Sequence, residues 1–312
     1  PDDEKDSTLN ASADNSDLDG IGALFSGSEK VQMTPLDPSP WAYDSGKVIE
    51  QGAVILGGVA QEFGFGLRQQ YFHKAAILVL DHDENQFTKG IILNRPTDMT
   101  LEDDINEGVK WRVWFGGDVQ GLSSSNPDIV CLHSLKDEQV VRASIPVMKN
   151  IQWTTFENAK RLVKVGAASV SDFWLFGGYA GWGPGQLLGE LDRQSWYMVA
   201  TDSQTLLHEL ARQTAGADPR EAGLDTWNLL VSMIGRDETA KGFTGGFDDL
   251  MLKEWAHKQL LSEEAGGEGS MIKSVSSTGL QTGSIDDFLK SVSTTGIGEQ
   301  ATAGTLLRAS SA

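Results

Sequence analysis

Residues 172–197 read DFWLFGGYAGWGPGQLLGELDRQSWY and contain three Trp, six Gly and one Pro. The apolar run 172–176 ends at a Gly-Gly pair (177–178), which predicts a buried strand that stops where the backbone turns or is closely approached. Pro184 precedes the sequence QLLGEL, so we expect it in the first turn of a short helix, where its missing N–H costs nothing. A second strand is expected to start at Ser195.

A second informative stretch, residues 71–96, reads YFHKAAILVLDHDENQFTKGIILNRP. Its two apolar runs, 75–81 and 87–93, are separated by the polar turn DENQ and predict a β-hairpin. Pro96 is expected to end this ladder, because proline has no N–H to donate.

Further elements follow from hydrophobic periodicity and capping signals along the chain. Asp202 is expected to cap the helix that follows it, because its side chain can accept hydrogen bonds from the first backbone N–H groups. The expected strands are 52–58, 111–115 and 128–133, and the expected helices are 156–163, 202–212, 226–234 and 247–260.

Two motifs give the chain a family resemblance. GYAGWGPGQLLGEL followed by SW, and an apolar strand ending in His before G-x-x-x-N-R-P, resemble the hallmarks of the YqgE/AlgH family, also called UPF0301. The resemblance covers about residues 51–236 and implies an α+β core, with a mixed and strongly curved β-sheet flanked by helices. It implies no defined biochemical role. The chain departs from the family at Asp118, where Pro is usual, and in a Ser-rich insertion at 123–126.

Composition narrows the classes of function. The chain has 25 basic and 44 acidic residues and a net charge of −19, so a nucleic-acid backbone would be repelled. Cys131 is the only cysteine, which excludes an intrachain disulfide and a cysteine-based zinc site and is typical of a reducing compartment. The longest clean apolar run, 75–80, is far shorter than the roughly 20 residues that a membrane span needs.

The chain divides into three parts by composition. Residues 1–40 form an acidic extended arm, 41–261 a single AlgH-like α+β domain, and 262–312 a tail rich in Gly, Ser and Thr. The chain starts with Pro1 instead of Met, as expected of a removed targeting segment or of an expressed fragment. Plant and algal members of the family are mostly plastid proteins, so the resemblance favours the chloroplast stroma; the alternative is the cytoplasm.

The tail contains an internal repeat. MIKSVSSTGL at 271–280 recurs seventeen positions later as FLKSVSTTGI at 288–297, and LLRASS at 306–311 is a shorter third copy. Each unit combines two apolar residues, one cation and several hydroxyl residues, a pattern that a plain solubilising linker does not need. The predicted partner-binding residues are Met271, Ile272, Lys273, Val275, Phe288, Leu289, Lys290, Val292, Leu306, Leu307 and Arg308.

Polar residues near the hairpin are candidates for a ligand site. His82 with its two flanking Asp residues could serve acid–base or metal chemistry, or could simply be a solvated turn. Asn94 and Arg95 could clamp a carboxylate or phosphate, because arginine offers a rigid fork of donors, or could cap the strand end locally. Trp182 and Gln186 on the Gly-rich turn complete this predicted surface, although Trp182 is favoured as a plug over the core.

No coherent catalytic set emerges from the sequence. Cys131 lies in an apolar run and is interpreted as an inert core residue, and Ser195 lacks the G-x-S-x-G elbow of a serine hydrolase. The Gly-rich turn lacks the order and the lysine of a phosphate-binding loop. We therefore expect no cofactor and no metal, and the enzyme interpretation is weakened.

Two functions remain. The first is a non-catalytic scaffold that assembles with itself, or with another plastid protein, through the repeated tail; a shell around an algal pyrenoid is its most specific form. The second is a regulator or small-molecule-binding enzyme that uses His82, Asn94 and Arg95.

Overall fold

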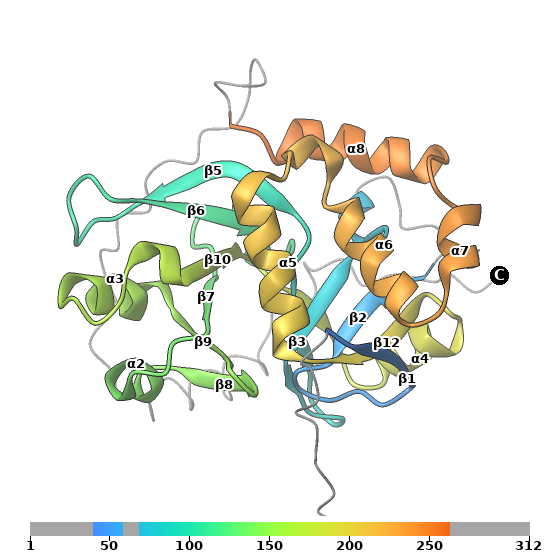
Figure 1. The fold of residues 1–312 in the computed structure, drawn as a ribbon, viewed down its shortest axis with the longest axis horizontal. Coiled ribbons are helices and arrows are strands. Elements are labelled where there is room, and N and C mark those ends of the chain that lie inside the picture. The colour runs from blue at the N-terminus through green and yellow to red at the C-terminus, as the bar shows by residue number, and fades with distance from the viewer. Residues whose placement is uncertain (1–39, 59–68, 263–312) are drawn as a thin grey trace, which may run out of the picture. The chain divides into compact units, whose positions relative to one another are not determined.

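The computed structural model describes residues 40–58 and 69–262 of the chain (Figure 1). The strands are β1 (Ala42–Gly46), β2 (Val54–Gly57), β3 (Ala76–His82), β4 (Thr88–Ile92), β5 (Pro96–Glu102), β6 (Lys110–Phe115), β7 (Ile129–His133), β8 (Ile145–Met148), β9 (Ile151–Thr155), β10 (Phe173–Gly177), β11 (Ala180–Trp182) and β12 (Trp196–Thr201). The α-helices are α2 (Glu138–Arg142), α3 (Phe156–Lys164), α4 (Gln186–Asp192), α5 (Ser203–Gly216), α6 (Leu224–Met233), α7 (Asp237–Gly242) and α8 (Phe247–Gln259), and the 3₁₀ turns are η1 (Gln70–Phe72), η2 (Val170–Asp172) and η3 (Pro219–Glu221).

The described strands form two six-stranded sheets, in the orders β1-β12-β2-β3-β4-β11 and β5-β6-β10-β7-β9-β8. Neighbours in the first sheet are antiparallel, whereas the second is mixed because β10 runs parallel to β6. The α+β class with flanking helices is therefore confirmed. The strands make two sheets instead of the single sheet expected, because the chain leaves the first sheet after β4 and enters the second at β5.

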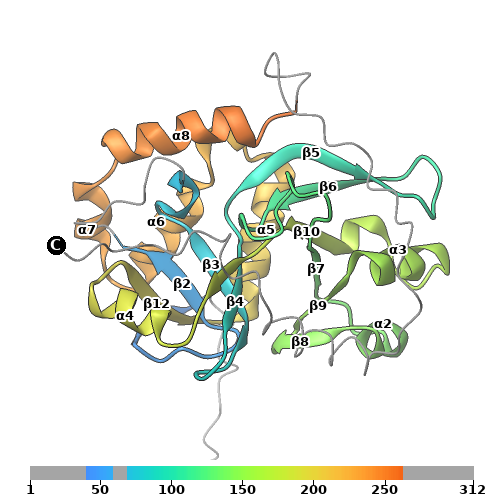
Figure 2. The same ribbon diagram turned by 180° about the vertical axis from the view of Figure 1, so that it is seen from behind.

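The core follows from the two-residue period of the strands. Val54 and Leu56 of β2 belong to the cluster that joins both sheets to α5 and α6, whereas Ile55 belongs to the cluster beneath α4 and η1. Successive side chains of a strand point to opposite faces, so the first sheet is buried on both sides. In Figures 1 and 2, α5 and α6 cover one side of the strands, and α2 and α3 lie beside the second sheet.

Most of the expected elements are present. The hairpin is β3–β4, the run 172–176 is β10, and Asp202 caps α5 by accepting a hydrogen bond from the backbone N of Thr205 at 2.9 Å. Pro96 does not end a strand but begins β5, the first position of a strand being one that proline tolerates.

The prediction that Pro184 lies in the first turn of a helix is wrong. Helix α4 begins only at Gln186, after Gly185, whose φ of +70° and ψ of −8° suit the third position of a type II turn. The Gln186 N–H closes this turn by donating to the carbonyl of Gly183 at 3.1 Å. Pro184 therefore occupies the second position of a turn that precedes the helix.

Two Gly-Gly pairs hold the sheet ends together by close backbone approach. Gly116 N donates to Gly177 O at 2.9 Å, and Gly178 N donates to Asp128 O at 2.8 Å. A Cβ on Gly178 would lie 2.3 Å from Gly117 O, and the φ of Gly178 is +76°. Only glycine satisfies both the contact and the left-handed backbone here, which explains the Gly-Gly pair at the end of β10.

This contact predicts that Gly178→Ala destabilises the core by about 3 kcal/mol, because the strain of a left-handed alanine adds to a backbone clash. Gly166→Ala is the matched control, since Gly166 has a φ of +75° but a Cβ on it would have nothing within 4 Å. The control should lose only about 1 kcal/mol. Urea unfolding followed by tryptophan fluorescence measures both losses. Equal losses in the two variants would show that close approach is not the constraint.

Candidate functional site

Asn94 lies inside the fold, where β4 passes to β5. Its Oδ1 accepts a hydrogen bond from the backbone N of Ala76 at 2.8 Å, and its Nδ2 donates to the carbonyls of Lys74 and Gly223, both at 3.0 Å. The side chain is fully buried, so its hydrogen-bonding groups serve the backbone around it. This is the local capping role that the sequence left open.

Arg95 is also fully buried and binds four backbone carbonyls. Its Nη1 donates to Asn94 O at 2.9 Å and to Ala222 O at 2.6 Å, and its Nη2 donates to Tyr71 O at 3.0 Å and to His73 O at 2.5 Å. Burial lowers the pKa of Arg95 to about 9, so the guanidinium is still charged at neutral pH. The structure thus uses the arginine fork on the protein's own backbone, and Arg95 presents no donor to a ligand at the surface.

Trp182 and Gln186 meet at a buried carboxylate. Glu190 Oε2 accepts from Trp182 Nε1 at 2.9 Å and from Trp196 Nε1 at 2.6 Å, and Glu190 Oε1 accepts from Gln186 Nε2 at 2.9 Å. Trp182 is buried, as expected of a plug. The sequence did not indicate Glu190, although its place four residues after Gln186 on one helix predicts that they share a face.

His82 lies at the end of β3. Unlike Asn94 and Arg95 it is only partly buried, and it has a different hydrogen-bond partner. Its Nδ1 is 2.8 Å from Thr88 Oγ1 across the hairpin, and the flanking Asp81 and Asp83 are exposed. Within the described ranges, no group of three His, Cys, Asp or Glu side chains is arranged to hold a metal. The structure therefore does not bring the predicted surface together at one place.

Two other titratable groups are buried in the second sheet. Cys131 belongs to the core cluster of β7, α2 and α3, and burial raises the pKa of its thiol. Burial lowers the pKa of His133 to about 4, which keeps the ring neutral. Its Nδ1 accepts from Leu135 N at 3.3 Å, so its Nε2 carries the hydrogen and donates to Ser144 Oγ at 2.8 Å. Neither group is free to act as a nucleophile or base.

The predicted partner-binding residues of the tail, 271–275, 288–292 and 306–308, lie outside the described residues. Residues 1–39 of the predicted acidic arm, 1–40, lie outside them too. Among the helices that the structure describes, none has the length and apolar character to cross a membrane.

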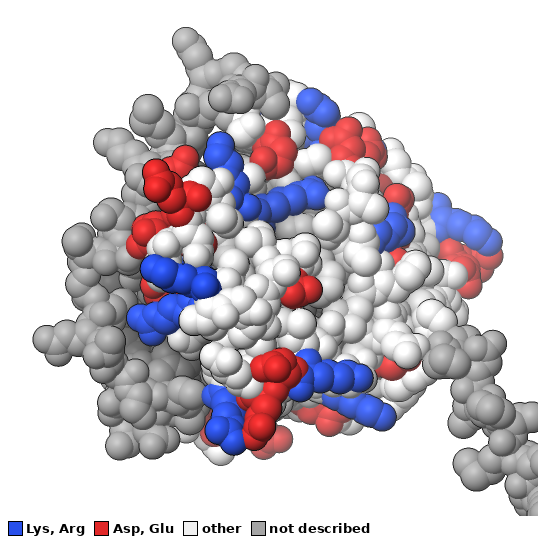
Figure 3. Space-filling view, turned by 60° about the vertical axis from the view of Figure 1, so that its left-hand side comes forward, with Lys and Arg blue, Asp and Glu red and all other residues white. Residues whose placement is uncertain are grey.

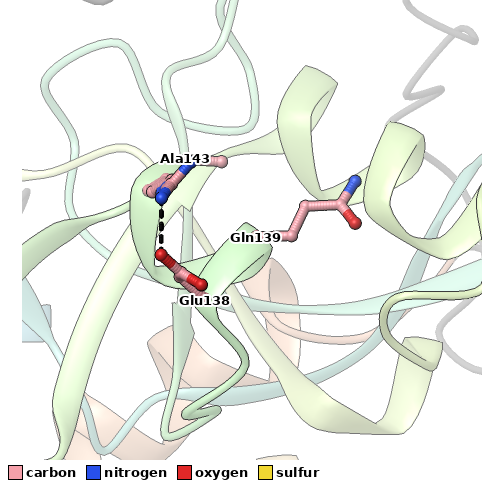
Figure 4. A pocket seen from close by; sticks show the side chains of 4 residues that line it. Glu138, Gln139 and Ala143 are labelled. Carbon is pink, nitrogen blue, oxygen red and sulfur yellow. Dashed lines mark hydrogen bonds and ion pairs between the residues drawn. The ribbon is translucent and has the colours of Figure 1, made fainter.

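A hollow on the described surface lies beside α2, where Glu138 pairs with Arg142 while Gln139 points away from the pair (Figure 4). Both charged side chains are largely exposed, and such surface ion pairs add little to the stability of the fold. The face around α2 and α3 carries acidic and basic side chains in mixed groups with uncharged surface between them (Figure 3). This hollow offers no convergent chemistry.

A second hollow has a volume of about 290 Å³ and lies where α7 connects to α8, with His73 and Asp249 among its lining residues. His73 Nε2 is 2.7 Å from Asp249 Oδ1, and Lys74 Nζ donates to Asp249 Oδ2 at 2.9 Å. Lys74 is nearly inaccessible and also donates to the carbonyl of Phe243 at 2.8 Å. A buried Lys-Asp-His cluster thus ties the chain after η1 to the start of α8.

The charge balance of this cluster favours an ionised Asp249. Burial opposes ionisation of Asp249, but hydrogen bonds from His73, Lys74 and Gly245 outweigh it and hold the pKa of the carboxyl below its usual range. Lys74 also lies 4.9 Å from the ring centroid of Trp227, in cation–π geometry. With its oxygens engaged by these donors, Asp249 serves as an anchor for α8 and not as a free catalytic base.

Large apolar side chains are exposed at the end of α7 and at the start of α8. Phe243, Phe247 and Leu250 are 51%, 70% and 62% exposed, respectively. The sequence predicted helix 247–260 but missed this surface. The signal was present, because α8 carries more apolar residues than one buried face can use, and Phe247 and Leu250 are spaced to share the other face.

The fold and the site together define a helix-flanked α+β domain whose described buried polar groups hold the structure together. The AlgH-like family model, DUF179, matches residues 63–225. The chain belongs to this AlgH-like family. It is 34% identical over 136 residues to a UPF0301 protein of Streptomyces coelicolor, covering 42% of this chain and 68% of the relative. It is 30% identical over 172 residues to one of Burkholderia lata, covering 52% and 83%.

Two solved structures align with part of the chain. A crystal structure of a Corynebacterium diphtheriae protein aligns with a TM-score of 0.41 and 18% identity, covering 62% of this chain and 92% of that one. The solution structure of the AlgH protein from Pseudomonas aeruginosa aligns with a TM-score of 0.40 and 17% identity, covering 63% and 94%.

The buried cluster predicts that Asp249→Asn lowers the free energy of unfolding by about 3 kcal/mol at pH 7, because it leaves Lys74 charged and buried without its carboxylate. Asp248→Asn, at the exposed neighbouring position, should change stability by less than about 0.5 kcal/mol. Urea unfolding measures both. A loss below about 1 kcal/mol for Asp249→Asn would contradict the anchoring role.

The same variants test the pH dependence. Because the folded pKa of Asp249 lies below its unfolded value of about 3.9, its stabilisation is complete above that value and is lost as the pH falls through the folded pKa. The stability gap between wild type and Asp249→Asn should therefore shrink below about pH 4. A gap that does not shrink in acid would contradict the lowered pKa.

Proposed function

We propose that this protein is a non-catalytic scaffold that assembles with further copies of itself through the repeated tail. The observation that carries the proposal is the repeat itself. The units at 271–280 and 288–297 share the order of two apolar residues, Lys, Ser, Val, Ser, and a Thr-Gly pair. The three cations that follow residue 262 are Lys273, Lys290 and Arg308, one in each unit. Selection for a flexible linker alone does not place charge in this way.

Multivalency explains how short units can support an assembly. One apolar pair with one cation gives weak binding, but linking several units raises the effective concentration for each further contact. A tail of one copy bound to the core of the next is a heterologous contact, which propagates into rings, tubes or sheets unless it closes. The described core supports this interpretation by offering exposed apolar surface on α8.

The cellular setting that we attach to this proposal is the chloroplast stroma, in an assembly of the pyrenoid-shell type. Its ground is the resemblance to plastid members of the family, and the curated relatives compared above are bacterial. A single chain with a folded core and a multivalent tail is suited to building such a coat from one component.

The scaffold proposal predicts that the full chain forms large particles by light scattering and negative-stain microscopy. Deleting residues 270–312 should reduce it to a small species. A full-length variant with Ser at the six apolar pair positions should behave like the deletion, because the units lose the groups that they bury. The six positions are Met271, Ile272, Phe288, Leu289, Leu306 and Leu307.

The control keeps the units and changes the residues between them, as in Gln281→Ser combined with Gln300→Ser. This control should assemble like the wild type. The scaffold function would be overturned if the full chain and the deletion variant were equally small. Unchanged assembly in the six-Ser variant would overturn it as well.

A further inference from the structure

Helix α8 has one buried and one open face. Leu252, Ala256 and Leu260 are buried and pack with Ala222 of the η3 turn, and Asp249 is buried against His73 and Lys74. Phe247 and Leu250 lie on the other side, spaced by three residues, and are mostly exposed. Phe243 extends this apolar surface to the end of α7. We call the α8 face the exposed apolar surface of Phe243, Phe247 and Leu250 together with Asp248, which is next to Phe247 in the first turn of the helix.

The α8 face combines apolar contact area with an uncompensated negative charge. Asp248 is exposed, lines the 290 Å³ hollow, and has no ion pair among the described residues. The neighbouring Asp249 is already engaged by Lys74 and His73. A hollow of this size is at the lower end of the range for small-molecule pockets, so it suits a few side-chain atoms of an extended segment.

We propose that the α8 face is the docking site for the tail units of a second copy of this chain. The apolar pair of a unit, such as Met271 and Ile272, packs on Phe247 and Leu250. The cation that follows the pair, Lys273 in the first unit, meets the carboxylate of Asp248. This inference rests on the proposed scaffold function and names the surface that the function requires.

Charge and composition make the two partners complementary. The part of the chain from 40 to 262 carries 29 acidic and 20 basic residues, so cations approach it favourably. Each tail unit supplies an apolar pair and one cation in consecutive positions, and the α8 face offers exposed apolar side chains with the carboxylate of Asp248 next to Phe247. Both partners, 237–259 and the tail, also lie outside residues 63–225 that match the family.

The number of docking sites favours a second copy of the chain as the source of the docked tail unit. Each core has one α8 face, whereas each tail has three units, so a single chain cannot engage all of its own units. The tail also leaves the core at Ser262, whose backbone N–H donates to Asp98 Oδ1 at 2.5 Å. This exit is at the far end of α8, about 20 Å along the helix from Phe247.

The test uses a fluorescein-labelled peptide of residues 269–281 and fluorescence anisotropy. The acceptor is the full-length chain with Ser at the six apolar pair positions of the tail, so that its own units do not compete. Saturable binding is expected. Phe247→Ser with Leu250→Ser in this acceptor should weaken binding at least tenfold, and Asp248→Asn should weaken it several-fold and reduce its salt dependence.

Val165→Ser is the control, because Val165 is 65% exposed at the end of α3 and its replacement removes exposed apolar surface away from α8. It should leave binding unchanged. A peptide with Lys273→Ala should lose the sensitivity to Asp248→Asn, as expected if the two charges meet. Thermal melts confirm that each acceptor is folded. Absence of saturable binding, or binding that survives Phe247→Ser with Leu250→Ser, would overturn the docking site.

The two proposals fail in different ways. If the peptide binds the α8 face but the wild-type chain stays small in solution, the docking site stands and the scaffold function is overturned. If the wild-type chain assembles and still does so with Phe247→Ser and Leu250→Ser, the scaffold stands and the α8 face is overturned as its receptor.

Discussion

The buried guanidinium of Arg95 is the contact on which the described fold depends. It lies where the chain passes from one sheet to the other, and its hydrogen bonds reach the backbone of η1 and of the η3 turn. A charged arginine inside a protein is costly unless its donors are satisfied, and four carbonyls satisfy most of them here. The backbone that Arg95 fixes includes Tyr71 and His73, which lead into the cluster that holds α8.

This arrangement forms a continuous path from the interior to the surface. Arg95 positions the segment after η1, that segment supplies His73 and Lys74, and Asp249 binds both and fixes the start of α8. The helix can then leave Phe247 and Leu250 exposed without losing its place, because its anchor is made of buried charge and hydrogen bonds. The buried cluster of His73, Lys74 and Asp249 resembles a reactive site, but it holds α8 in position. The exposed face of α8 is the surface that the proposed assembly uses.

Several parts of this structure follow from sequence alone, and others do not. The Gly-Gly pair at 177–178 predicts a close backbone approach, and the alternation in 75–93 predicts the β3–β4 hairpin, because both signals are local.

The division into two sheets depends on where the chain crosses at Asn94, and periodicity does not encode that choice. Arginine in an N-R-P motif has the same sequence whether its fork binds a ligand or four backbone carbonyls, so the motif does not encode the role of Arg95. The contact between Lys74 and Asp249 cannot be predicted from local sequence either, because the two residues are 175 positions apart. The exposed face of α8 could have been predicted, because the apolar content of 247–260 exceeds what one buried stripe requires.

The most direct measurement is cross-linking between labelled copies. A light chain carrying a photoreactive amino acid at position 250 is mixed with a nitrogen-15 chain of wild-type sequence, and the linked peptides are identified by mass spectrometry. Docking of a tail on the α8 face of another copy should give links from position 250 to heavy peptides that contain 271–280 or 288–297. Links only to light tail peptides, or to no part of the tail, would contradict it.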